Sequence, residues 1–134
     1  MSSLSRLPLA GIRVIELGQL LAGPFAGTLL AYFGAEVIKV EPPGGDPIRG
    51  WRKLDDEGTS FWWRSLGRNK KCITLDLKNP RGIEVAQKLI QDADVVIENF
   101  RPGTMEKWGL GPEQFKLSNP RLIYTRISGY GQTG

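Results

Sequence analysis

The sequence predicts an α/β fold, in which an open, mostly parallel sheet carries flanking helices. Two observations support this prediction. The chain has 134 residues, of which 40% are apolar and 24% charged, a composition typical of a single soluble domain. Along it, short apolar runs with β-branched residues alternate with segments whose apolar residues recur at helical spacing. Such alternation of strand and helix patterns favours a parallel sheet.

A βαβ unit opens the chain. Residues 12–17 (IRVIEL) form a short β-rich apolar run, which predicts a strand. Pro24 suits the start of a helix, where its missing N–H costs nothing, and apolar residues recur at helical spacing over 25–33. Gly34 ends the helix, and residues 35–41 (AEVIKVE) predict a second strand. We expect the two strands to be parallel neighbours with a right-handed crossover.

The middle of the chain has weaker patterns. Residues 42–47 (PPGGDP) are too rich in turn formers to be anything but a loop. Residues 48–71 show no periodicity and contain three of the four tryptophans. Residues 72–77 (CITLDL) alternate apolar and polar side chains, which predicts a third strand with one buried face.

The remaining sequence predicts three helical segments and two strands. An amphipathic helix begins at Asn79-Pro80 and ends near Asp92. Its apolar stripe indicates that one face packs against the sheet. The other expected elements are a strand at 93–99, a short turn of helix at 104–108, a helix at 112–117 and a strand at 122–127.

Composition excludes several kinds of chemistry. Cys72 is the single cysteine and the chain has no histidine, which excludes an internal disulfide, a Cys/His metal site and histidine catalysis. We therefore expect no metal. The start of the chain (MSSLSRLPLAG) lacks the apolar core of a secretory signal, and no apolar stretch is long enough to span a membrane. These features predict a cytoplasmic chain without a membrane partner.

Charge and loop composition indicate an anionic ligand. The 18 basic and 14 acidic residues give a net charge of +4, which is too modest to indicate nucleic acid. Ligands of open α/β sheets bind beyond the carboxyl ends of the strands. The loops expected at that edge, rich in Gly, Pro, Asn and basic residues, are 18–24, 42–49, 99–103 and 128–134.

A cluster of four cations occupies residues 64–71 (RSLGRNKK). A phosphate-rich ligand would explain it, and a solvated loop is the commoner use of such a run. Trp62 and Trp63 beside it could stack on an adenine, although tryptophan is more often buried in packing.

Several segments of the chain form one pattern: LPLAGIRVIEL at 7–17, LAGP at 21–24, GAEVIKVE at 34–41, GD at 45–46, RNKK at 68–71, LDLK at 75–78, VIENFRPG at 96–103, GLG at 109–111 and ISGYGQTG at 127–134. Together they resemble the class III CoA-transferases, the family that includes formyl-CoA transferase, carnitine CoA-transferase and α-methylacyl-CoA racemase. The resemblance covers almost the whole chain, in order and spacing. It implies a Rossmann-like core, as an incomplete large domain at the amino-terminal part of a longer enzyme.

The resemblance implies coenzyme A as the ligand, bound as acyl-CoA. Basic side chains, an aromatic ring and helix N-termini suit its phosphates and adenine. By similarity, the positions that match the family's CoA contacts are Leu20, Leu75, Lys78, Asn99, Phe100, Thr104, Lys107 and Tyr130. The sequence departs from formyl-CoA transferase at Pro42 and Ser128, where that enzyme has an arginine and a lysine.

Family members transfer CoA between an acyl-CoA and a free carboxylic acid through an aspartyl covalent intermediate. The resemblance places that aspartate beyond Gly134, so no catalytic residue is assigned in this chain. It also implies an interlocked homodimer for the full-length form. We expect the chain alone to expose apolar faces and to associate.

Three other functions stay open. A racemase or isomerase of the same family would need an acid/base pair that also lies beyond Gly134. A non-catalytic CoA-binding fragment is the second. The third is a dinucleotide-binding Rossmann domain, which Glu41 favours by its place at the end of the second strand. Against it, the glycines of the first loop stand at 18, 23 and 27 and lack the G-x-G-x-x-G spacing.

Overall fold

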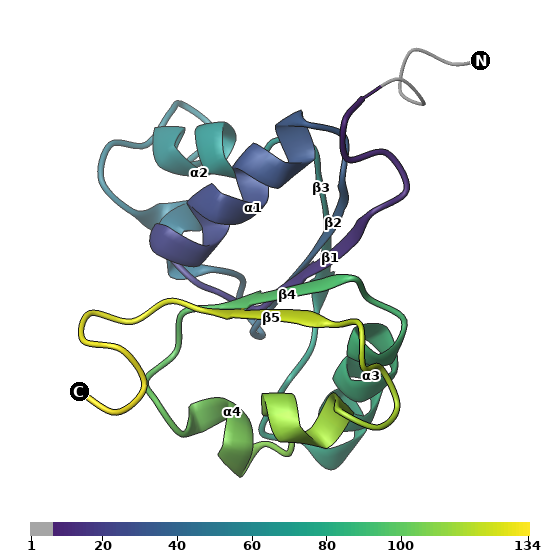
Figure 1. Cartoon of the computed structure of the whole chain (residues 1–134). Coiled ribbons are helices and arrows are strands. Elements are labelled where there is room, and N and C mark those ends of the chain that lie inside the picture. The colour runs from purple at the N-terminus through teal and green to yellow at the C-terminus, as the bar shows by residue number, and fades with distance from the viewer. Residues whose placement is uncertain (1–6) are drawn as a thin grey trace.

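The computed structural model describes residues 7–134. Residues 1–6, which include part of the stretch expected to lack a secretory signal, lie outside the described range. All five strands are parallel and form one sheet in the order β3-β2-β1-β4-β5 (Figure 1), which confirms the predicted α/β class. The strands are β1 (Arg13–Glu16), β2 (Glu36–Glu41), β3 (Lys70–Thr74), β4 (Val95–Glu98) and β5 (Ile123–Arg126).

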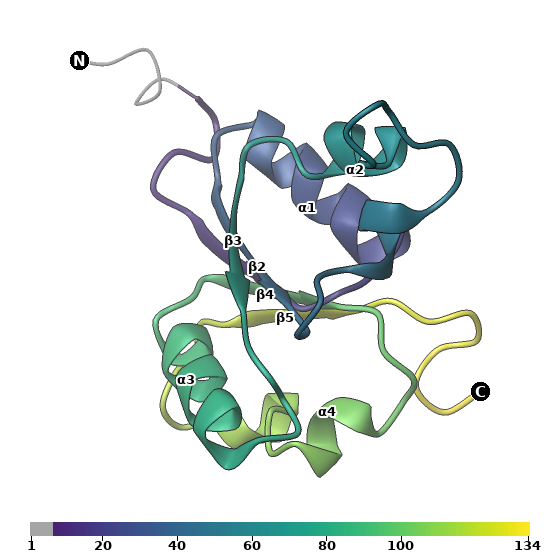
Figure 2. The same ribbon diagram turned by 180° about the vertical axis from the view of Figure 1, so that it is seen from behind.

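Helices cover both faces of this sheet. Figure 1 shows α1 and α2 on one face and α3 and α4 on the other, and Figure 2 shows the chain crossing between the faces after β3. Within residues 7–134, no helix is both long enough and apolar enough to cross a membrane. The helices are α1 (Ala22–Tyr32), α2 (Phe61–Leu66), α3 (Pro80–Gln91) and α4 (Thr104–Lys107), with 3₁₀ turns η2 (Pro47–Gly50) and η3 (Pro112–Phe115).

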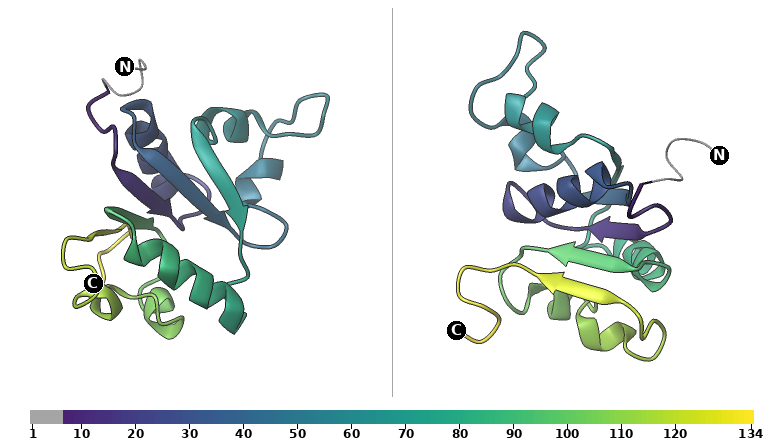
Figure 3. Two further views of the ribbon diagram at one scale, coloured as in Figure 1. Left: turned by 90° about the vertical axis from the view of Figure 1, so that its right-hand side faces the viewer. Right: turned by 45° about the horizontal axis from the view of Figure 1, so that its top comes forward.

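The sheet reverses its winding direction between β1 and β4. From β1 the chain winds outward through β2 and β3, then returns through α3 to place β4 on the other side of β1. Figure 3 shows the arrows of β1, β4 and β5 pointing the same way, so the loops that follow them leave from one edge. A topological switch point of this kind opens a crevice for a ligand at that edge.

Strand alternation creates two cores. Ile15 and Leu17 face α3 and α4 and pack with Val96 and Ile90. On the other face, Val14 packs with residues of α1, β2 and β4. The predicted apolar face of the third strand segment is confirmed, because its isoleucine and leucines all pack against the α3 side of the sheet.

Three predicted boundaries differ from the structure. The first helix begins at Ala22, so that Pro24 stands inside its first turn, where a missing N–H is still without cost. Strand β3 starts at Lys70 and ends at Thr74, because Asp76 turns the chain by accepting the N–H of Lys78. The expected helix at 112–117 is a single 3₁₀ turn.

The segment that lacked periodicity contains two short helical elements. The Asp46 carboxylate accepts the N–H of Ile48 at the start of η2, and the Ser60 hydroxyl accepts the N–H of Trp62 at the start of α2. Capping side chains, rather than an apolar stripe, therefore define these elements.

Helix α1 carries apolar side chains on its outer side. Phe25 and Phe33 are each 54% exposed, and Leu29 and Tyr32 lie between them on the helix and are also exposed. This agrees with the expectation that the chain exposes an apolar face. Association through that face stays a prediction.

Replacing Gly27 tests how closely α1 packs against the sheet. A Cβ at this position would lie 2.0 Å from the Glu16 carboxylate, which is itself buried. We expect Gly27→Ala to lower the free energy of unfolding by about 3 kcal/mol, the upper end of the cost of overpacking. Urea unfolding measures it. Gly50→Ala is the matched control, because a Cβ there meets nothing within 4 Å; an equal loss in both variants would contradict the prediction.

Candidate ligand-binding site

A pocket of about 490 Å³ lies beyond the carboxyl ends of β1 to β4. Its walls come from the loops on both sides of the switch point. Three of the residues expected to contact CoA line it: Leu75, Lys78 and Phe100. The complete lining is Leu17, Gln19, Val40, Glu41, Pro42, Pro43, Leu75, Asp76, Leu77, Lys78, Phe100 and Trp108.

One wall of the pocket is aromatic, and its charged lining residues are Lys78, Asp76 and Glu41. The rings of Phe100 and Trp108 meet edge to face, with centroids 5.2 Å apart. Lys78 is exposed on the turn after β3, where its N–H is held by the Asp76 carboxylate. The pocket thus combines an apolar, aromatic wall with one ammonium group, Lys78, which lies among two carboxylates. The apolar wall suits an apolar arm of a ligand, and Lys78 suits a phosphate.

The other five expected residues do not line this pocket, although all follow carboxyl ends of strands. Leu20 lies after β1, and Tyr130 is 89% exposed in the loop after β5. Thr104 and Lys107 stand at the two ends of α4. Asn99, directly after β4, accepts the N–H of Gln19 and donates to its carbonyl.

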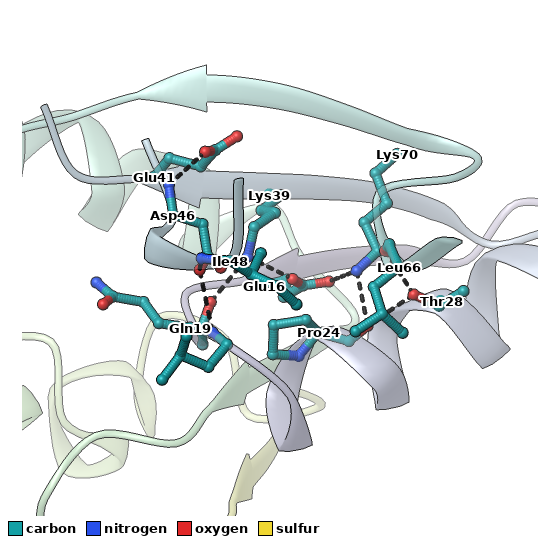
Figure 4. Close-up of polar contacts among 12 residues, drawn as sticks. Glu16, Gln19, Pro24, Thr28, Lys39, Glu41, Asp46, Ile48, Leu66 and Lys70 are labelled. Carbon is teal, nitrogen blue, oxygen red and sulfur yellow. Dashed lines mark hydrogen bonds and ion pairs between the residues drawn. The ribbon is translucent and has the colours of Figure 1, made fainter. Parts of the chain in front are cut away.

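A buried ion network lies under the loop that follows β1 (Figure 4). The Lys39 ammonium contacts Glu16 at 2.9 Å and Asp46 at 2.8 Å, and it donates to the carbonyl of Gly18. The Lys70 ammonium contacts the second oxygen of Glu16 at 2.7 Å and donates to the Pro24 carbonyl. All four charged side chains are at most 1% exposed, so two acids and two lysines neutralise one another inside the protein.

Strand register brings these charges together. Glu16 and Lys39 are direct partners in the parallel ladder between β1 and β2. Burial would lower the pKa of the Lys39 ammonium, but the adjacent carboxylates outweigh it and raise that pKa. At Lys70, burial is the larger influence and lowers the pKa.

A second ion pair extends the network towards the pocket. Arg49 binds Glu41 through two contacts, at 2.7 and 2.6 Å, and stacks over the Trp63 ring at 3.6 Å. Glu41 also accepts the N–H of Asp46 at 2.7 Å. Both oxygens of Glu41 therefore have partners within the chain, so the position of Glu41 is explained without a ribose hydroxyl.

The cationic cluster at 64–71 mainly forms ion pairs within the chain, which is neither of the two expected uses, phosphate binding and a solvated loop. Lys70 is buried against Glu16, and Lys71 contacts Glu36 at 2.6 Å. Arg64 pairs with Asp55 and Glu57. Three of the four cations are thus engaged in ion pairs within the chain, rather than presented to phosphates or only to solvent.

The tryptophans beside that cluster are also used in packing. Trp62 lies 6.0 Å from Trp51, measured between ring centroids, and Trp63 carries Arg49 on its face. The expectation that they stack on an adenine is not supported by this arrangement, although Trp62 remains 45% exposed.

Sequence reasoning missed several residues of this region. Gln19 and Trp108 line the pocket, and Lys39 and Asp46 hold the loops beside it. A signal for Lys39 was present, because a lysine at an inward position of an apolar strand requires a buried partner. Within residues 7–134, no group of His, Cys, Asp and Glu is arranged to hold a metal ion.

The fold and the pocket define an open parallel α/β protein with a pocket at its switch point. The comparisons give the family: residues 9–134 match the family model described as CoA-transferase family III, and the chain belongs to that family.

The curated relatives are CoA-transferases about three times as long as this chain. The chain is 58% identical over 128 residues to the succinyl-CoA–D-citramalate CoA-transferase of Chloroflexus aurantiacus, covering 95% of this chain and 32% of that protein. It is 48% identical over 134 residues to the succinate–glutarate CoA-transferase of Agrobacterium fabrum, covering 95% and 34%. The chain therefore spans about a third of the length of these relatives.

Solved structures agree with this assignment. A CAIB/BAIF family protein from Brucella suis matches with a TM-score of 0.89 and 45% identity, over 96% of this chain and 35% of that one. A hypothetical protein from Mycobacterium tuberculosis matches with a TM-score of 0.88 and 44% identity, over the same shares.

Replacing Lys39 tests how much the buried ion network contributes to stability. Removing its ammonium leaves Asp46 and one oxygen of Glu16 without their cation in a dry environment. We expect Lys39→Met to lower the free energy of unfolding by about 3–5 kcal/mol. Lys71→Met is the control, because its ion pair with Glu36 is exposed and should cost less than about 1 kcal/mol. Thermal and urea unfolding of both variants measures the two changes. Similar losses of unfolding free energy in the two variants would contradict the prediction.

Glu41 gives the network a pH dependence. Burial alone would raise the pKa of this carboxyl, but Arg49 and the Asp46 N–H hold it below its ordinary value of 4.5. The stability it contributes is present above pH 4.5 and is lost as the pH falls through the lower pKa of the folded state.

We therefore expect the free energy of unfolding to fall less steeply on acidification below that pH in Glu41→Gln than in the unsubstituted chain. Urea titrations at several pH values measure the slope. Glu84→Gln, which alters an exposed carboxylate on α3, should keep the original slope. An unchanged slope in Glu41→Gln would show that this carboxyl does not couple folding to pH.

Proposed function

We propose that this chain is the CoA-binding, amino-terminal portion of an enzyme that transfers coenzyme A between an acyl-CoA and a free carboxylic acid. The pocket at the switch point carries the proposal, because it combines Lys78 with an apolar, aromatic wall in a chain of this family. The two relatives are named for succinyl-CoA, D-citramalate, succinate and glutarate, which favours dicarboxylic substrates.

The proposed binding mode divides CoA between two parts of the edge. Leu75 and Phe100 contact an apolar part of the ligand within the pocket, and Lys78 binds a phosphate at its rim. Asn99, Thr104 and Tyr130 extend the site along the loops after β4 and β5, and Leu20 extends it along the loop after β1. Lys107 adds a second cation on α4.

The bond-making residue belongs, in this proposal, to the sequence after Gly134. An aspartate carboxylate there attacks the acyl thioester, which forms a mixed anhydride and releases the CoA thiolate. The thiolate then attacks the aspartyl carbonyl of the anhydride, which releases the donor acid and leaves CoA on the enzyme as a thioester. The racemase and the non-catalytic alternatives share the binding site and differ only in that later sequence. The interlocked homodimer is proposed for the full-length form, and relatives named as alpha and beta subunits are in keeping with a multimer.

Calorimetric titration of the chain with CoA, and separately with NAD, tests the proposal. We expect heat of binding with CoA and none with NAD. Lys78→Ala should raise the Kd for CoA about 10-fold, since a charge-assisted bond contributes about 1.5–3 kcal/mol. Lys88→Ala is the control, because that exposed lysine lies on α3 and pairs with Glu84.

Two results would overturn the assignment. The first is binding of NAD without any response to CoA. The second is an equal loss of CoA affinity in the Lys78 and Lys88 variants, which would mean that general charge rather than the pocket binds the ligand. Transfer of CoA from succinyl-CoA to a dicarboxylate by the full-length protein would separate the transferase from the racemase.

A further inference from the structure

We propose that Asp46 is a positioning residue of the CoA pocket: it holds Leu20 in a left-handed conformation and so fixes the loop between β1 and α1 as a pocket wall. The inference rests on the proposed function, because its first readout is CoA binding. It assigns a role to a residue that does not itself line the pocket.

The carboxylate of Asp46 connects three parts of the fold. One oxygen accepts the N–H of Leu20 at 3.1 Å and the N–H of Ile48 at 3.0 Å. The other oxygen contacts the Lys39 ammonium at 2.8 Å. Asp46 is 1% exposed, so these bonds form in a dry environment, where they hold their geometry firmly.

Leu20 has the backbone conformation that most needs such support. Its φ of +62° lies in the left-handed region, which a residue with a Cβ adopts at a cost of about 1–2 kcal/mol. Such strain persists only where the surroundings fix it. The bond from the Leu20 N–H to Asp46 is a contact that fixes it.

The rest of the loop is held in the same way by side chains of other strands. Lys39 on β2 donates to the Gly18 carbonyl. Asn99, after β4, is hydrogen-bonded to both the N–H and the carbonyl of Gln19. Gln19 in turn lines the pocket. Leu20 is the next residue along the chain, so its conformation directs the turn from the pocket wall into α1.

A double-mutant cycle separates positioning from a general structural role. If Asp46 acts by holding Leu20 at positive φ, glycine at position 20 makes that support less necessary, because glycine adopts this conformation without strain. If Asp46 acts only through its ion pair with Lys39, Asp46→Ala has the same effect on the Kd whether position 20 is leucine or glycine.

The experiment measures the Kd for CoA by calorimetry in the 134-residue chain, at a temperature where circular dichroism shows each variant folded. We expect Asp46→Ala to raise the Kd at least 10-fold in the unsubstituted background and less than 3-fold in the Leu20→Gly background. Asp55→Ala is the matched control with unchanged affinity, since Asp55 also accepts backbone N–H groups, of Glu57 and Thr59, but lies outside the pocket lining. Should Asp46→Ala not fold, Asp46→Ser enters the same cycle under the same criteria.

An equal loss in both backgrounds would overturn the inference. If the unsubstituted chain does not bind CoA, the proposed function fails, and amide hydrogen exchange then tests the positioning role separately. The N–H of Gln19 is bonded to Asn99 and not to Asp46. We expect Asp46→Ala to speed its exchange at least 10-fold, and less in the Leu20→Gly background. An unchanged rate would show that Asp46 does not hold the loop.

Discussion

The structure depends on a charge-neutral cluster in its interior. Taking Glu16, Asp46 and two lysines out of water costs several kcal/mol per ion, and only close contacts among all four offset that cost. The attraction offsets this cost only while the distances between the charged groups stay short. The cluster therefore fixes the relative positions of three strands, the start of α1 and the loop after β2, which together carry the pocket.

The spacing of the glycines in the loop after β1 and in α1 follows from the side chains of Asn99 and Glu16. A Cβ at Gly18 would lie 2.6 Å from the Asn99 amide oxygen, and one at Gly23 would lie 3.2 Å from the same atom. Gly27 leaves room for Glu16. In a dinucleotide-binding domain the glycines admit a pyrophosphate. Here Gly18 and Gly23 leave room for the side chain of Asn99, which follows β4, and Gly27 leaves room for the buried Glu16 carboxylate, so the glycine spacing differs.

Periodicity predicted the parts of the fold in which burial alternates regularly. The βαβ unit, α3 and the parallel sheet were predicted because apolar residues dominate their inward faces. The segment at 48–71 could not be predicted, because capping by Asp46 and Ser60 and the packing of Arg49 on Trp63 leave no period in the sequence. At the site, Leu75, Lys78 and Phe100 came from resemblance, whereas Gln19 was missed because its place depends on long-range contacts with Asn99.

The contact of Gly27 with Glu16 also shapes how this protein can change over evolutionary time. Four buried charged side chains balance one another, at positions 16, 39, 46 and 70, and Gly27 leaves room for one of them. An isolated replacement at any of these five positions therefore disturbs the others. Neutral drift there requires compensating replacements within the same lineage. Natural variants should consequently preserve this set as a block or exchange it together.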